Sequence, residues 1–136
     1  QLMACDMRLQ FENLEKTIYS DSKWIDFVLG QMISNSIKYR SDNPILLFSA
    51  EENKDSILLR IKDNGIGIAD SDLSRIFSKG FTGNNGRKYA KSTGMGLYLC
   101  KQLCGKMHLN IYAESEIDKG TIITIVFPKD SRTLLE

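Results

Sequence analysis

The sequence contains few of the residues that build metal centres and disulfide frameworks, because its 136 residues include one histidine and three cysteines. Three cysteines cannot all pair within one chain, and no Cys-x-x-Cys motif accompanies His108, so no zinc site is expected. Cys100 and Cys104 are four residues apart in an apolar helical pattern, where free thiols act as small buried hydrophobic groups. These features predict a reducing compartment.

Long hydrophobic runs and an excess of one charge are also missing. No apolar stretch reaches the roughly 18 residues that a membrane-spanning helix needs. Eighteen basic and seventeen acidic residues leave a net charge of +1, so no overall field would attract nucleic acid or an anionic membrane. We therefore expect one soluble domain over residues 1–136, with 42% hydrophobic residues for its core and any phosphate site formed locally.

Hydrophobic periodicity predicts a mixture of strands and helices. The expected strands cover residues 7–12, 17–19, 45–50, 56–62, 109–114 and 121–127. The expected helices cover residues 23–39, 70–77 and 94–107, the first of them preceded by the N-cap types Ser20, Asp21 and Ser22. We predict an α/β (α+β) two-layer sandwich, in which a mixed sheet of about five strands carries about three helices on one face.

An acidic residue leads from a predicted strand into a glycine-rich turn at Asp63-Asn64-Gly65-Ile66-Gly67-Ile68. A carboxylate at this place can accept a hydrogen bond from an exocyclic amine, and the two glycines allow a flat ring or a phosphate to approach the backbone. These properties suit adenine. Taken alone, the segment is equally compatible with an ordinary turn.

The first long helix is predicted to have a polar face, because about 3.6 residues per turn place Gln31, Asn35 and Lys38 together. The amide oxygen of Asn35 suits Mg²⁺, which combines a few protein oxygens with water and phosphate. Lys38 offers a point charge for phosphate. The alternative is that these residues form the solvated side of an amphipathic helix. Apolar residues lie roughly opposite, at Ile25, Leu29, Met32, Ile33 and Ile37.

A second glycine motif, Thr93-Gly94-Met95-Gly96-Leu97, opens the last predicted helix. Unpaired N–H groups at a helix start bind phosphate, and glycine permits close approach, although a tight turn into a helix has the same sequence. The preceding glycine-rich and basic stretch, residues 78–93, is expected to be a mobile lid because it cannot build a core. Phe81 in this lid has no local core and is suited to covering a nucleotide or docking on a partner domain.

In order and spacing, three motifs resemble the N, G1 and G2 boxes of the ATP-binding domain of sensor histidine kinases. They are Asn35 with Lys38 and Tyr39 for the N box, Asp63-x-Gly65-x-Gly67 for the G1 box, and Gly94-x-Gly96-Leu97 for the G2 box. Residues 75–83 resemble the F box, and the resemblance covers residues 7–128. It implies the Bergerat ATP-binding fold, shared with Hsp90, gyrase and MutL, and the cofactors ATP and Mg²⁺. It implies a catalytic role for Asn35 and Lys38 and a metal site of Asn35 and Gln31. The nucleotide-binding residues that it implies are Asn35, Lys38, Tyr39, Asp63, Gly65, Gly67, Ile68, Phe81, Thr93, Gly94, Gly96, Leu97 and Thr121.

Gln31 departs from the family pattern, since many histidine kinases carry asparagine at that position. Hydrolytic members of the superfamily carry a glutamate there to activate water. A glutamine cannot act as a general base near neutral pH, so phosphoryl transfer is favoured over hydrolysis.

The phosphoacceptor histidine of the family is not found, because His108 lies at a predicted strand start and lacks the following acidic residue. The resemblance therefore implies the catalytic domain of a longer kinase, whose dimerisation and membrane domains would precede Gln1. The isolated domain would be a monomer that binds ATP without autophosphorylation. The parent would be a membrane homodimer with this domain at the cytoplasmic face of the cell membrane, passing phosphate to a response regulator.

Residues 31–35 and 79–83 are most similar to the small membrane kinases that accompany peptide-antibiotic transporters in Gram-positive bacteria. Two other functions remain open at this point. One is a stand-alone anti-sigma-type serine kinase of the same fold. The other is a non-catalytic module in which ATP orders the lid to present a partner surface.

Overall fold

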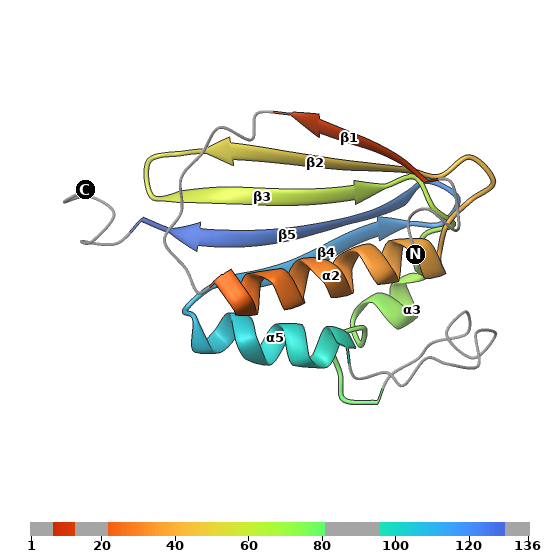
Figure 1. The fold of residues 1–136 in the computed structure, drawn as a ribbon. Helices are drawn as coiled ribbons and strands as arrows, with labels where there is room; N and C mark the ends of the chain where they lie inside the picture. Colours follow the sequence, from red (N-terminus) through yellow and green to blue (C-terminus); the bar gives the residue numbers. More distant parts are fainter. Residues whose placement is uncertain (1–6, 13–21, 81–95, 130–136) are drawn as a thin grey trace.

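The structure is a computed structural model that describes residues 7–12, 22–80 and 96–129. Within these ranges five strands form one sheet in the order β1-β2-β3-β5-β4. The strands are β1 (Arg8–Glu12), β2 (Ile45–Glu52), β3 (Ser56–Asp63), β4 (Asn110–Glu116) and β5 (Gly120–Pro128). The helices α2 (Ser22–Lys38) and α5 (Gly96–Lys106) lie side by side on one face, and the short α3 (Asp70–Leu73) lies near the C-terminal end of α2 (Figure 1). The predicted two-layer sandwich with a five-stranded sheet is confirmed.

The sheet is mixed because β1 pairs with β2 in parallel, whereas the other three pairs are antiparallel. Two hairpins, β2–β3 and β4–β5, meet at the centre of the sheet, where β3 pairs with β5. In this register Asp63, at the end of β3, lies between Leu46 on β2 and Thr121 on β5. Residues distant in the sequence are thereby brought to one end of the sheet.

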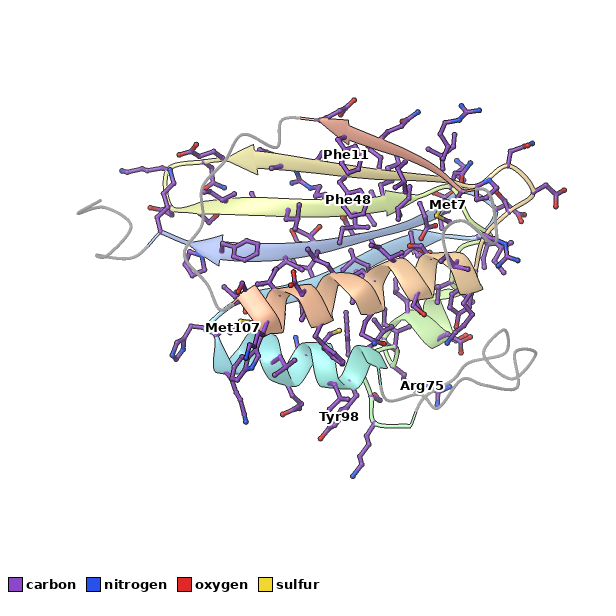
Figure 2. All side chains as sticks on the ribbon, viewed as in Figure 1. Met7, Phe11, Phe48, Arg75, Tyr98 and Met107 are labelled. Atoms are coloured by element: carbon purple, nitrogen blue, oxygen red, sulfur yellow. The ribbon has the colours of Figure 1, made fainter. Side chains whose placement is uncertain are left out.

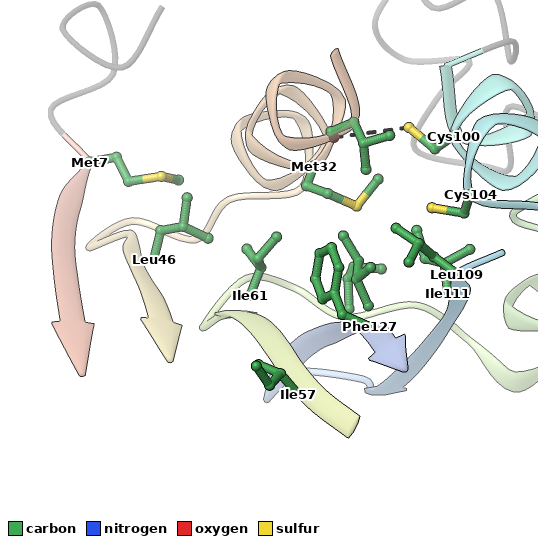
Figure 3. Close-up of a cluster of buried hydrophobic side chains, with 13 residues drawn as sticks. Met7, Met32, Leu46, Ile57, Ile61, Cys100, Cys104, Leu109, Ile111 and Phe127 are labelled. Atoms are coloured by element: carbon green, nitrogen blue, oxygen red, sulfur yellow. Dashed lines mark hydrogen bonds between the residues drawn. The ribbon is translucent and has the colours of Figure 1, made fainter. Parts of the chain in front are cut away.

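The core lies between the sheet and the two long helices (Figure 3). Alternate residues of the central strands face the helices, which supply Met32 from α2 and the thiols Cys100 and Cys104 from α5. Both cysteines are buried and free, as the helical pattern predicts. Burial, reinforced by Cys104, raises the pKa of Cys100 to about 12, so this thiol is unreactive.

An aromatic pair lies at the β1 edge of the sheet. Phe11 on β1 and Phe48 on β2 stack with ring centroids 5.3 Å apart (Figure 2). Phe11 nevertheless remains 60% exposed, because β1 is an edge strand.

The helix predicted over residues 70–77 is wrong beyond Leu73. Successive turns follow α3, with Arg75 N–H donating to Asp72 and Ser78 N–H donating to Arg75. Serine and aspartate in this segment favour such local turns over a continuous helix. The turns bring Ile76 into a buried position, at 5% exposure.

Several predicted features lie outside the described residues. They are the strand at residues 17–19, the caps Ser20 and Asp21, and residues 81–93 of the predicted lid. Among the helices of the described ranges, none is long and apolar enough to cross a membrane.

Candidate functional site

Asp63 is the last residue of β3 and is only 6% exposed although it carries a carboxyl group. Its Oδ1 accepts hydrogen bonds from the backbone N–H groups of Gly65 at 2.9 Å and Thr121 at 3.1 Å. Ser36 Oγ donates to Oδ2 at 3.2 Å. Burial raises the pKa of Asp63, and the three hydrogen bonds oppose that rise. Since a carboxylate has about four acceptor positions, about one remains on Oδ2 after these three bonds.

The two glycines that follow Asp63 lie so close to the backbone of other segments that a Cβ would not fit at either position. A Cβ on Gly65 would collide with the carbonyl oxygen of Tyr39, which also accepts a hydrogen bond from Ile66 N–H at 2.9 Å. Gly67 has a φ of 79°, and a Cβ there would collide with the carbonyl of Glu116. The predicted glycine turn is present, and the chain itself occupies the space beside both glycines.

The turn between β4 and β5 holds the segment that follows β3. Ser115 Oγ accepts a hydrogen bond from Ile68 N–H at 2.8 Å and lies 2.7 Å from Thr121 Oγ1. Asp118 N–H donates to the carbonyl of Ile66 at 2.8 Å. These contacts fix the buried Ile68 and Thr121 beside the end of β3. Sequence reasoning missed Ser115, because its partner Thr121 is brought opposite by strand register alone.

Ser36 is a second residue of the site that the sequence analysis missed. It is 4% exposed and follows Val28 and Met32 at four-residue intervals on the buried stripe of α2. A hydroxyl group in a buried position needs a hydrogen-bond partner, which here is Asp63. The signal in the sequence was a polar residue at the next position of an apolar stripe.

The polar side of α2 approaches the same end of the sheet. Gln31, Asn35 and Lys38 are each half-buried, and Asn35 and Lys38 lie in the same helical turn as Ser36. Burial lowers the pKa of Lys38, whose Nζ lies 5.8 Å from the ring centroid of Tyr39. Asn35 and Lys38 of the predicted N box therefore lie next to Ser36, which donates to the buried Asp63 carboxylate.

Gly96, the first residue of α5, lies against α2. A Cβ on Gly96 would collide with Oε1 of Gln31, and Cδ of the same side chain would be 3.1 Å away. The next residue, Leu97, packs on the hydrophobic core. The structure thus brings the predicted N box and part of the G2 box into contact.

Phe81, Thr93 and Gly94 lie outside the described residues. In the part of the chain that the structure describes, no group of three or more His, Cys, Asp or Glu residues could hold a metal ion. A magnesium site built from the amides of Asn35 and Gln31 remains a prediction, since a metal held mainly by phosphate and water needs few protein ligands.

Residues 20–131 match the family described as "Histidine kinase-, DNA gyrase B-, and HSP90-like ATPase". The chain is 35% identical to Sensor histidine kinase GraS of Staphylococcus epidermidis over 134 residues, covering 98% of this chain and 38% of GraS. It is 39% identical to Sensor protein BceS of Bacillus subtilis over 113 residues, covering 83% of this chain and 34% of BceS. The chain therefore spans little more than a third of the length of these curated relatives.

The fold is also that of solved kinase domains. The catalytic domain of histidine kinase ThkA matches with a TM-score of 0.77 at 21% identity, covering 94% of this chain and 84% of that chain. ThkA in complex with response regulator protein TrrA matches with a TM-score of 0.74 at 19% identity, covering 95% of this chain and 36% of that chain. The match over residues 20–131 shows that the chain belongs to the histidine kinase-, DNA gyrase B- and HSP90-like ATPases, and its architecture is that of solved histidine kinase catalytic domains.

Proposed function

We propose that the chain binds Mg-ATP at the end of β3 and donates the γ-phosphate to a histidine on the dimerisation domain of a longer sensor histidine kinase. The observation that carries this proposal is the buried carboxylate of Asp63, which three donors orient and which keeps an acceptor position on Oδ2. Adenine presents an exocyclic amine at its Watson–Crick edge, and this amine can donate to the open position on Oδ2. An ionised carboxylate therefore suits adenine, and the comparison with GTP tests whether the site selects it.

Phosphoryl transfer depends on positioning and charge neutralisation more than on covalent chemistry by the protein. Asn35 and Gln31 would hold Mg²⁺ through their amide oxygens, and the bound ion would neutralise charge on the phosphates. Lys38 adds a positive charge on the same helix, and its partial burial strengthens its attraction to an anion. The first turn of α5, which begins at Gly96, would supply N–H groups to the phosphates.

The acceptor and the cellular setting belong to the same proposal. His108 is exposed with a φ of 61° after the end of α5, which does not suit a helical phosphoacceptor. We therefore assign the acceptor to another domain of a membrane-bound homodimer, with this chain at the cytoplasmic face. The similarity to GraS and BceS and the kinase–regulator complex of ThkA support a response regulator as the next phosphate acceptor. The proposal includes a link to peptide-antibiotic transport.

Calorimetric titration with ATP and GTP tests the nucleotide site. Asp63→Asn should weaken ATP binding by about tenfold to a hundredfold, because a hydrogen bond to a charged group is lost. The matched control is Asp55→Asn, which changes an exposed carboxylate next to the opposite end of β3. Unchanged ATP affinity in the Asp63 variant of a folded chain would exclude this carboxylate as the adenine acceptor.

A second experiment tests the acceptor. The chain is mixed with a helical histidine domain of a sensor kinase and with ATP labelled on its γ-phosphate. Acid-labile phosphohistidine on that domain is the expected product. Acid-stable phosphoserine on a partner protein would instead identify a serine kinase, and ATP binding without any transfer would identify a nucleotide-gated binding module.

A further inference from the structure

Gly96 differs from the other glycines of the site in what surrounds it. A Cβ on Gly65, Gly67 or Gly120 would collide with the backbone of another segment. On Gly96 the colliding atom is Oε1 of Gln31, followed by Cδ at 3.1 Å and Cγ at 3.8 Å. Among the described residues, the three atoms nearest to that position therefore all belong to the side chain of Gln31.

The packing of α2 and α5 explains why this contact forms. The two helices run antiparallel (Figure 1), and Cys100 Sγ lies 3.9 Å from the carbonyl oxygen of Val28 (Figure 3). About one turn further along each helix, the same register brings Gln31 to Gly96. The side chain of Gln31 continues the helix interface up to the point where α5 begins.

We infer that Gln31 is a positioning residue, whose side chain packs on Gly96 and fixes the first turn of α5 against α2. The inference deepens the proposed function and rests on it in one respect: this turn is where the phosphates of ATP would bind. Gly96 is then required to leave room for Gln31, and the sizes of the two residues are coupled. A metal-binding role for Gln31 is the alternative that the experiment must separate.

Backbone hydrogen exchange in the first turn of α5 tests the contact without nucleotide. Gln31→Ala and Gly96→Ala should each speed exchange at residues 100–102, whose N–H groups donate to the carbonyls of the first turn of α5, because each removes the same packed arrangement. The double variant should exchange no faster than either single variant, since a shared contact can be lost only once. Additive effects, or no change in Gln31→Ala, would overturn the inference.

A matched control separates the contact from the change in helix propensity. Gly105 lies in the same helix, and a Cβ on it would meet no atom of the described residues within 4 Å outside the neighbouring backbone of α5. Gly105→Ala should therefore leave the first turn of α5 unchanged. Gln31→Asn combined with Gly96→Ala removes one methylene and adds one methyl. Hydrogen exchange in the first turn of α5 should therefore be slower in this double variant than in Gly96→Ala alone.

ATP affinity with Mg²⁺ and with a chelator then tests positioning against metal binding. Gln31→Ala should weaken ATP binding by about threefold to tenfold in both conditions and leave adenosine binding unchanged. A loss confined to the Mg²⁺ condition would make Gln31 a metal ligand, and a normal ATP affinity would show that the contact does not position the phosphate site. Either result would overturn the inference. If the unsubstituted chain bound no ATP, the proposed function would fail, and hydrogen exchange would still decide whether Gln31 holds the start of α5.

Discussion

At the scale of single residues, the burial of Asp63 favours nucleotide binding and lowers the stability of the folded chain. A carboxylate at 6% exposure loses much of its hydration, and three hydrogen bonds replace it only in part, so its pKa stays raised. The same burial keeps water from competing for the open position on Oδ2. A residue chosen for stability alone would not be charged here.

The pH dependence of stability should reveal this conflict in Asp63→Asn. An asparagine keeps an oxygen for Gly65 and Thr121 and can donate to Ser36, so the fold should be retained. Because the folded chain holds the Asp63 proton more tightly than the unfolded chain, the stability from this group is complete below the ordinary pKa of 3.8. It is lost as the pH rises through the raised pKa.

The free energy of unfolding of Asp63→Asn, relative to the unsubstituted chain, should therefore increase with pH across that window and stay constant above it. Urea unfolding at several pH values measures this difference. A difference that falls with rising pH would mean that hydrogen bonding outweighs burial at this carboxyl group. Asp55→Asn again serves as the exposed control.

Ser36→Ala should weaken ATP binding through the Asp63 carboxylate. Loss of a hydrogen bond to a charged group costs about 1.5–3 kcal/mol, and part of this cost should appear in ATP affinity. Without the hydroxyl the pKa of Asp63 should rise further. As the pH is lowered, the ATP affinity of Ser36→Ala should therefore start to fall at a higher pH than the affinity of the unsubstituted chain does. Calorimetry across pH measures both effects. Ser34→Ala, two residues earlier on α2, is the control, and an unchanged pH profile in Ser36→Ala would contradict the assigned role.

At the scale of elements, the end of α5 shows how a single residue can stop a helix. His108 has a φ of 61°, its N–H donates to the carbonyl of Gly105, and Leu109 N–H donates to Cys104. This is the hydrogen-bond pattern of a Schellman motif, in which glycine is the residue best suited to the left-handed position. The motif turns the chain from the helix layer directly into β4.

His108→Gly should therefore stabilise the domain by about 0.5–1 kcal/mol, because the side chain is exposed and the left-handed conformation no longer strains a Cβ. Thermal or urea unfolding measures the change. His108→Ala retains the Cβ and should give no gain. A loss of stability in the glycine variant would show that the imidazole makes a contact that stabilises the helix end.

At the scale of the whole molecule, stability should decrease from the centre of the sheet to its β1 edge. The central strands β3 and β5 each pair on both sides and face the helix layer. The edge strand β1 pairs only with β2 within the described residues, and all five of its residues are exposed. Edge strands of this kind open without unfolding the core.

Amide hydrogen exchange should accordingly be slowest in β3 and β5 and faster by more than about tenfold in β1. Mass spectrometry of peptides covering residues 7–12 and 56–63 compares the two regions in one experiment. The other edge strand, β4, pairs with β5 along seven residue pairs, and its exchange rate provides an internal comparison with β1. Equal protection of β1 and β3 would mean that the sheet unfolds as one unit.

Local periodicity was enough to predict the elements and much of the core. The stripe from Leu97 to Met107, the two buried thiols and the long α2 follow from side-chain spacing, which one element determines by itself. The predicted continuation of α3 to Phe77 failed because turn bonding and the burial of Ile76 outweighed weak helix propensity. Serine and aspartate lower the helix propensity of this segment, because their side chains offer hydrogen bonds to local turns.

The sequence by itself determined which residue types lie at the site, because motif order and helix periodicity are properties of neighbouring residues. Only the tertiary structure decided the environment of Asp63, whose donors Ser36 and Thr121 are 27 and 58 residues away. It also decided the neighbour of Gln31, since helix register rather than sequence distance brings that side chain to Gly96. Hydrogen bonding and steric fit act across space, and strand pairing and helix packing set those distances.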